Sequence, residues 1–184
     1  MSVSIHRYAR AQEPGDLTRD DLITIWGLLK AEGLVEIFFH DGGIATLNAF
    51  LRSAMAPELW FYAARRKGEF IGLGMINGFS SSGNTAYAHL VSFACGREGS
   101  FREAGRLWFD GLARAGIETL IAVLPACYRG ARRFAQDFDF KEQLRLPGAL
   151  HLARGGKGRT TDAVVLLKDL RTLTRQQSSD GNKE

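Results

Sequence analysis

A short segment near the middle of the chain has the composition of an anion-binding turn. It contains two glycines and three polar or charged residues, namely Gly96, Arg97, Glu98, Gly99 and Ser100. Glycine lets a phosphate approach the backbone closely, and the free N–H groups at the start of a following helix attract anions. Arginine pairs well with phosphate oxygens. We therefore treat this segment as a candidate phosphate site.

The same segment also fits an ordinary capped helix after a glycine turn. Ser100 and Glu103 have the spacing of a capping box, in which the two side chains satisfy two of the N–H groups that a ligand would need. Glu98 and Glu103 would also place negative charge beside a bound phosphate. Three arginines offset this charge only in part, namely Arg97, Arg102 and Arg106. The sequence leaves both interpretations open.

A histidine is the candidate catalytic base. His89 lies in an extended apolar run, and an imidazole changes protonation near neutral pH. Strand histidines also pack without catalytic work, so this alternative stays open. His40 lies in a linker between two predicted helices. Cys95 and Cys127 are expected to be small buried hydrophobes, and their number and spacing indicate neither a disulfide framework nor a metal site.

The composition is that of a globular protein. The 184 residues are 45% hydrophobic and 24% charged, and we expect one domain over 1–171 with a polar, disordered tail over 172–184. The first ten residues lack an apolar signal region, and no run approaches the roughly 20 apolar residues of a membrane span. We expect a cytoplasmic location and no membrane partner. The net charge of +4 is modest and no basic run is interleaved with aromatics, so a nucleic-acid partner is not expected.

Apolar spacing predicts the elements that position these residues. The first half gives a strand at Val3–Ala9, a helix capped by Thr18 and ended by Gly33, a helix over Gly43–Ala56, and strands at Leu59–Ala64 and Phe70–Asn77. The second half gives a strand at Thr85–Phe93, a helix from Ser100, a strand at Thr119–Leu124, a helix after Pro125, and strands at Gln143–Leu146 and Ala163–Leu167 with an extended piece near Leu150.

This order predicts an α/β fold with a mixed, mostly antiparallel central sheet. The order is β-α-α-β-β-β-α-β-α-β-β. The strands Thr85–Phe93 and Thr119–Leu124 should be adjacent and parallel, because a helix connects them. The continuous apolar run of Thr119–Leu124 indicates a strand buried on both faces.

The order and three local patterns resemble the acyl-CoA N-acyltransferase (GNAT) superfamily. The hairpin from Trp60 to Gly72 resembles the family's central hairpin, and Ala86–Phe93 with the helix from Ser100 resembles its pyrophosphate-binding unit. The segment Tyr128–Phe140 resembles the family's Asn-x-x-Ala-x-x-Leu-Tyr-x-x-x-Gly-Phe helix. The matching positions are Tyr128, Ala131, Phe134, Ala135, Asp139 and Phe140. The stretch after Tyr128 is similar to that of phage-borne members.

The resemblance implies an N-acyltransferase that moves an acetyl group from acetyl-CoA to a small-molecule or protein amine. Such a reaction needs a base, for which His89 is the candidate. The resemblance implies that the cofactor contacts the residues Val91, Ser92, Phe93, Tyr128 and Arg132 in addition to the glycine segment. It also implies that Ala135 stands where many relatives carry a tyrosine acid. A homodimer through the last strands fits the family. The alternative is a catalytically degenerate module of the same fold that binds CoA or a macromolecular partner.

Overall fold

The structure is a computed structural model that describes residues 2–9, 13–80, 84–96, 99–153 and 158–171. The tail predicted over 172–184 lies outside these residues. In chain order the elements are β1 (Val3–Arg7), α1 (Arg19–Ala31), α2 (Val35–Phe38), α3 (Leu47–Ala54), β2 (Trp60–Arg66), β3 (Glu69–Asn77), β4 (Thr85–Ser92), the 3-10 turn η1 (Ala94–Gly96), α4 (Ser100–Arg114), β5 (Thr119–Pro125), α5 (Arg129–Asp137), β6 (Lys141–Leu152) and β7 (Arg159–Asp169). The predicted order is confirmed, with the short helix α2 as an addition.

The strands form one mixed sheet in the order β1-β2-β3-β4-β5-β7-β6. Every neighbouring pair is antiparallel except β4 and β5, which are parallel as predicted. The parallel pairing joins Thr85–Tyr87 to Thr119–Ile121 and goes no further, although β4 continues to Ser92 and β5 to Pro125. The two strands therefore separate toward their carboxyl ends.

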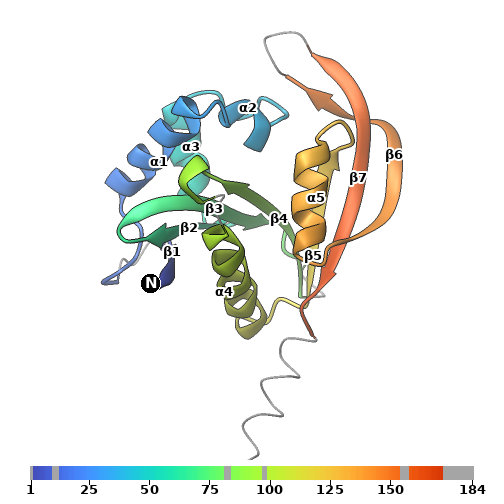
Figure 1. The fold of residues 1–184 in the computed structure, drawn as a ribbon. Coiled ribbons are helices and arrows are strands. Elements are labelled where there is room, and N and C mark those ends of the chain that lie inside the picture. The colour runs from blue at the N-terminus through green and yellow to red at the C-terminus, as the bar shows by residue number, and fades with distance from the viewer. Residues whose placement is uncertain (1, 10–12, 81–83, 97–98, 154–157, 172–184) are drawn as a thin grey trace, which may run out of the picture.

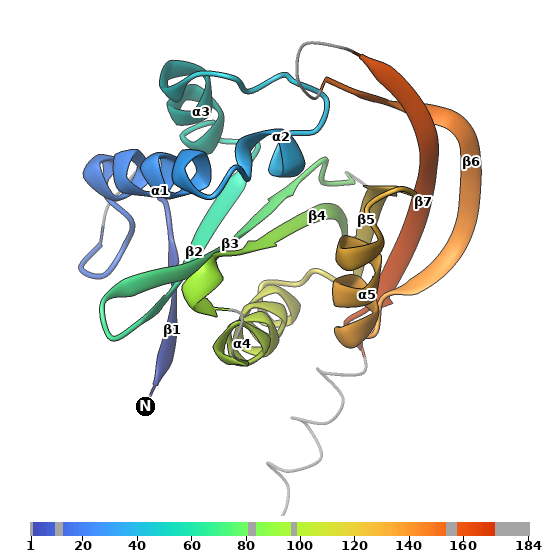
Figure 2. The ribbon, with the colours of Figure 1, turned by 45° about the horizontal axis from the view of Figure 1, so that its top comes forward.

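Helices cover both faces of the sheet formed by β1 to β4 (Figures 1 and 2). On one face, α1, α2 and α3 bury side chains such as Ile25 and Phe50 against Phe61 of β2 and Met75 of β3. On the other face, α4 packs its aromatic residues, including Trp108, on the sheet. Helix α5 lies on the same side as α4, next to β5 and β7 (Figure 2). Among the described residues, no helix is long and apolar enough to cross a membrane.

The prediction that β5 is buried on both faces is wrong. Leu120 and Ala122 are buried, whereas Ile121 and Val123 on the opposite face are only half-buried. The reason is that α1, α2 and α3 pack on β2, β3 and β4, so that they cover only one half of the sheet. The apolar residues of β5 thus reflect the burial of one face of this strand against α4 and α5.

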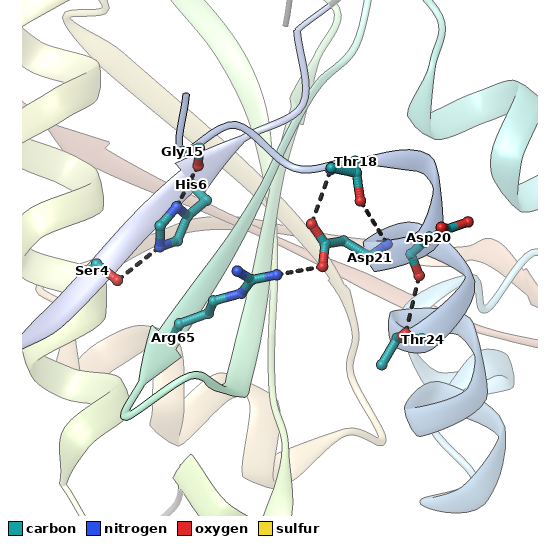
Figure 3. Close-up of polar contacts among 8 residues, drawn as sticks. All are labelled: Ser4, His6, Gly15, Thr18, Asp20, Asp21, Thr24 and Arg65. Atoms are coloured by element: carbon teal, nitrogen blue, oxygen red, sulfur yellow. Dashed lines mark hydrogen bonds and ion pairs between the residues drawn. The ribbon is translucent and has the colours of Figure 1, made fainter. Parts of the chain in front are cut away.

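The start of α1 is fixed to the sheet by a small polar cluster (Figure 3). Thr18 and Asp21 form the predicted capping box, with hydrogen bonds of 2.9 and 3.1 Å, and Asp21 also pairs with Arg65 of β2. Burial alone would raise the pKa of Asp21, but the hydrogen bonds with Thr18 and the Arg65 guanidinium outweigh it and lower that pKa. Helix α1 therefore has a defined position over the sheet.

The two last strands form a long hairpin that differs from the prediction. The segments expected at Gln143–Leu146 and near Leu150 belong to one strand, β6, whose register with β7 is irregular between Leu146 and Leu150. Gly148 has a φ of +60° at this irregularity. Pro147, which has no backbone N–H, lies next to Gly148. These two residues predict an end to the strand, whereas in the structure the strand continues through them with a bulge.

Candidate functional site

A cavity lies where β4 and β5 separate. Its volume is about 80 Å³, and its walls come from β4, β5, α2 and α5. The β4 wall contains His89, the α2 wall contains Phe38, and the α5 wall contains Ala131 and Ala135. Tyr128, at the start of α5, also lines it. The topology thus brings together side chains that are distant in the sequence, because parallel strands leave an opening where their pairing ends.

The N–H groups of β4 divide between its two edges according to position. The N–H of Phe93 donates to the carbonyl of Ile71 at 3.1 Å, and Val91 pairs with Leu73 in the same alternation. The N–H groups of Val91 and Phe93 therefore face β3, whereas those of Leu90 and Ser92 face the edge from which β5 has separated. Of the predicted contacts Val91, Ser92 and Phe93, only Ser92 presents its N–H to the open edge.

The predicted capping box at Ser100 is wrong. The residue before α4 is Gly99, which has a φ of +93° and provides no side-chain cap. Ser100 lies inside the first turn, and its Oγ donates to the carbonyl of Gly96 at 3.4 Å. The helix begins one residue earlier than the pattern suggests, because Gly99 in a left-handed conformation takes the N-cap position that the pattern gives to Ser100. Among the described residues no side chain caps the start of α4, so this helix N-terminus is suited to an anion.

Two charged side chains near the start of α4, those of Arg102 and Glu32, have protein partners. Arg102 pairs with Asp137 at 3.1 Å. The N–H of Ala94 donates to both carboxylate oxygens of Glu32, at 3.0 and 2.9 Å, which links the end of α1 to the turn after β4. No sequence pattern predicts this contact, because its partners are 62 residues apart. The predictions for Arg97 and Glu98 lie outside the described residues.

The two predicted α5 contacts differ in their surroundings. Tyr128 lines the cavity, whereas the guanidinium of Arg132 pairs with Glu142 of β6 at 2.6 Å. Ala135 is 8% exposed and forms part of the cavity wall, so the position that matches the family's tyrosine does face the site. Only a methyl group occupies it.

His89 is largely buried and lies edge-on to Phe38, with ring centroids 6.5 Å apart. Burial, helped by the neighbouring His40 and opposed by Asp41, lowers the pKa of His89 to about 4. The imidazole is therefore neutral at neutral pH. Its low affinity for a proton makes it a weak general base, because the best catalytic pKa lies near the working pH. The role of His89 as the base stays a prediction.

The expectation that both cysteines are buried is wrong. Cys95 and Cys127 are exposed, one in η1 and the other just before α5. Partial burial raises the pKa of the Cys95 thiol, and its Sγ donates to the carbonyl of Phe70 at 3.2 Å. A thiol with a raised pKa stays protonated at neutral pH, so Cys95 is not an activated nucleophile.

A second cavity, of about 430 Å³, lies between α1, α2 and the connection that leads to α3. Trp26, Phe39 and Ile44 are among its walls, and Ala153 after β6 closes one side. His40 lines this cavity and also the one between β4 and β5. Sequence analysis noted His40 but missed the cavity, because α2 has only four residues and shows no period.

A mixed sheet with separating parallel strands, a helix starting at a glycine turn between them, and α1 to α3 on one face define the acyl-CoA N-acyltransferase (GNAT) fold. Comparison with solved structures agrees with this assignment. The chain is similar to spermidine N-acetyltransferase from Vibrio cholerae in complex with CoA and spermine, with a TM-score of 0.71, 11% identity, and coverage of 92% of this chain and 96% of that one. The predicted fold class is confirmed.

Two further structures are similar over most of their length. The ribosomal-protein-S18-alanine N-acetyltransferase from Escherichia coli has a TM-score of 0.63 and 13% identity, with 92% and 94% of the two chains covered. An N-acetyltransferase from Staphylococcus aureus Mu50 has a TM-score of 0.67 and 14% identity, with 92% and 99% covered. No family model and no curated protein sequence matches the chain. At these identities the likeness establishes the fold.

Proposed function

We propose that the chain is an N-acyltransferase that moves an acetyl group from acetyl-CoA to an amine. The observation that carries the proposal is the open edge of β4. The N–H groups of Leu90 and Ser92 point toward the space left by β5, and this space continues into the cavity that His89 and Ala135 line. Backbone donors fixed in a strand can polarise a carbonyl without reorganisation, which is what acyl transfer needs.

The residues present fit acetyl-CoA as a co-substrate. Gly96, Gly99 and Ser100 surround an uncapped helix N-terminus that would hold its phosphates, and Arg97 stays a predicted contact. Acetyl-CoA supplies a thioester whose acetyl group an amine can attack. The N–H groups of Leu90 and Ser92 would orient its carbonyl. The methyl group of Ala135 supplies no proton for the leaving thiolate, so that step needs a different donor.

The test is binding of acetyl-CoA to the purified chain, measured by calorimetry. Ala131 lines the cavity from α5, and Ala131→Trp should fill it and weaken binding at least about tenfold, which corresponds to about 1.4 kcal/mol. Gln136→Trp is the matched control, because Gln136 lies on the same helix and is exposed. Equal affinity in wild type and Ala131→Trp, or no binding in wild type, would contradict the proposal.

A thiol-release assay with acetyl-CoA and a panel of amines then separates turnover from binding alone. The resemblance to N-acetyltransferases favours turnover, and a degenerate binding module would hold acetyl-CoA without releasing thiol for any amine. The acceptor in this proposal is an amine, and a nucleic acid is not proposed as a partner. The cytoplasm is the proposed location.

A homodimer through the last strands is also a proposal. Leu144 and Leu146 of β6 are each 46% exposed on a strand at the edge of the sheet. An apolar edge strand is suited to pairing with another chain. Light scattering over a range of protein concentrations measures the mass, and a monomer at every concentration would contradict a homodimer.

A further inference from the structure

The cavity next to α2 has walls that the fold holds in place. The N–H of Ala153 donates to the carbonyl of His40 at 3.0 Å, which ties the end of β6 to the connection after α2. Gly42, with a φ of +76°, lies so close to this point that a Cβ there would be 2.6 Å from the Cβ of Ala153. The cavity is therefore bounded by a defined contact between distant segments. Its volume of about 430 Å³ suits a small molecule.

The wall chemistry selects for an apolar body with a single charge. Trp26, Val35, Phe39 and Ile44 contribute apolar surface. Among the lining residues that the structure describes, Glu36 is the one carboxylate and Lys30 the one other full charge, so the walls offer a single partner for an ammonium and no cluster of carboxylates. A linear polyamine carries several positive charges and needs several carboxylates, whereas an amine with one charge and an aromatic or aliphatic body needs one.

His40 is the side chain that the two cavities share. It is half-buried at the end of the α2 segment, and it lines both the cavity with apolar walls and the cavity between β4 and β5. A side chain in this position can contact a molecule bound in either of the two cavities. It is therefore placed where a nucleophile from one cavity would meet an electrophile in the other.

We propose that the cavity between α1 and α2 takes a compact amine with an apolar or aromatic body, and that His40 is the group that accepts its proton. This inference rests on the proposed acetyl transfer. As the amine nitrogen forms its bond to the acetyl carbon, the carbon–sulfur bond breaks and its electron pair leaves on sulfur. The ammonium form of the amine first releases one proton to water, and the neutral amine then attacks. The proton that the nitrogen loses as the new bond forms goes to an imidazole nitrogen of His40 and then to the thiolate, which leaves as the thiol.

The electrostatic surroundings of His40 agree with this sequence of steps. Burial lowers its pKa, and Asp41 opposes that effect. In the part of the chain that the structure describes, the charged or titratable groups around it are Asp41 beside it, Lys30 on α1, Glu36 on α2, His89 on β4 and Tyr128 at the start of α5. The imidazole is thus neutral at neutral pH and able to take a proton. Once protonated it is a stronger acid than a thiol of pKa about 8.5, so it can pass the proton on to the thiolate.

The first experiment measures amine binding without any turnover. By calorimetry, 2-phenylethylamine should bind the wild-type chain at least about tenfold more tightly than spermidine. Ala45→Trp should narrow the cavity, because Ala45 lies in its wall, and weaken 2-phenylethylamine binding at least about tenfold. Ala115→Trp, at an exposed position after α4, is the matched control and should bind as wild type does.

Parallel titrations with acetyl-CoA separate a failure of the proposed acetyl transfer from a failure of the proposed amine site. If acetyl-CoA does not bind, the proposed acetyl transfer fails, whatever the amine does. If acetyl-CoA binds while 2-phenylethylamine does not, or while Ala45→Trp leaves its affinity unchanged, the assignment of this cavity is overturned. Tighter binding of spermidine than of 2-phenylethylamine would also overturn it.

The second experiment examines His40 by the pH dependence of kcat for thiol release. His40→Gln should lower kcat about 100-fold or more and remove the rise of kcat on the acidic side, while the calorimetric Kd for 2-phenylethylamine changes less than about threefold. His6→Gln on β1 is the matched control and should behave as wild type. An unchanged kcat or an unchanged acidic limb in His40→Gln overturns the role of His40, as does the absence of turnover in wild type.

Discussion

Gly74 of β3 lies directly beneath an aromatic ring of α4, and replacing it with alanine should destabilise the protein. A Cβ at position 74 would lie 2.8 Å from both Cε2 and Cζ2 of Trp108 and 3.2 Å from its Cδ2. Ordinary carbon–carbon contacts are about 3.5–4.0 Å, so the indole has to move by about 0.7–1.2 Å. Trp108 is only 3% exposed, which leaves its ring little free space.

The expected cost of Gly74→Ala is about 1–3 kcal/mol, the range for overpacking a core. For a chain of this length, that corresponds to a fall in Tm of about 2–4 °C per kcal/mol. Thermal and urea unfolding followed by circular dichroism measure it. Gly111→Ala in α4 is the matched control. Apart from the neighbouring residues and the helix's own backbone, no described atom lies within 4 Å of a Cβ at position 111, so this change should stabilise the helix by about 0.5–1 kcal/mol.

A double-mutant cycle tests the cause. All three atoms nearest to a Cβ at position 74 belong to Trp108, so removing the indole should remove most of the cost. In a Trp108→Leu background, Gly74→Ala should cost less than about 0.5 kcal/mol, which gives a coupling of about 0.5 kcal/mol or more. An equal cost in both backgrounds would refute the argument from the ring contact.

Two further predictions concern the site itself. If the ring fits, Ala135→Tyr should place a phenol in the cavity wall and raise the rate of thiol release at least about tenfold. An unchanged rate in a variant that binds acetyl-CoA as tightly as wild type would contradict this prediction. The pKa of His89 is about 4 in the folded chain, against an ordinary value of 6.5. Between these pH values the unfolded chain binds more protons than the folded chain does, so stability is lost as the pH falls from 6.5 toward 4. His89→Leu should remove a pH-dependent loss of roughly 3 kcal/mol between these limits, measured by urea unfolding at pH 7.5 and 4.5, and identical pH dependence in both proteins would refute it.

The parallel pairing of β4 and β5 was predictable because its signals are local. The helix from Ser100 separates an alternating run from a continuous apolar one, and such a connection joins parallel strands. The capping box of Thr18 and Asp21 was predictable for the same reason, since both partners lie within one turn. Each of these features depends on residues close together in the chain.

The errors occur where the outcome depends on backbone conformation or on distant contacts. Ser100 and Glu103 have the spacing of a capping box, yet the positive φ of Gly99 places Ser100 inside the helix. The residue types are the same in both arrangements, so no pattern separates them. In the cavity next to α2, the hydrogen bond between Ala153 and His40 closes one wall. Ala153 follows β6, which comes after the last helix in the sequence, so only the folded sheet brings these two residues together.

The candidate site depends largely on the register of β4 against β3, which the side chains of β4 specify only indirectly. Leu90 and Ser92 present their N–H groups to the open edge because Phe93 donates to Ile71, and a shift of one residue would exchange the two sets. Any residue type except proline can supply such a donor. Two chains of this fold can therefore present the same donors with little sequence in common. This chain is 11–14% identical to the structural neighbours described above. What distinguishes this chain is then the set of side chains around those donors, in particular the methyl group of Ala135 and the imidazole of His40.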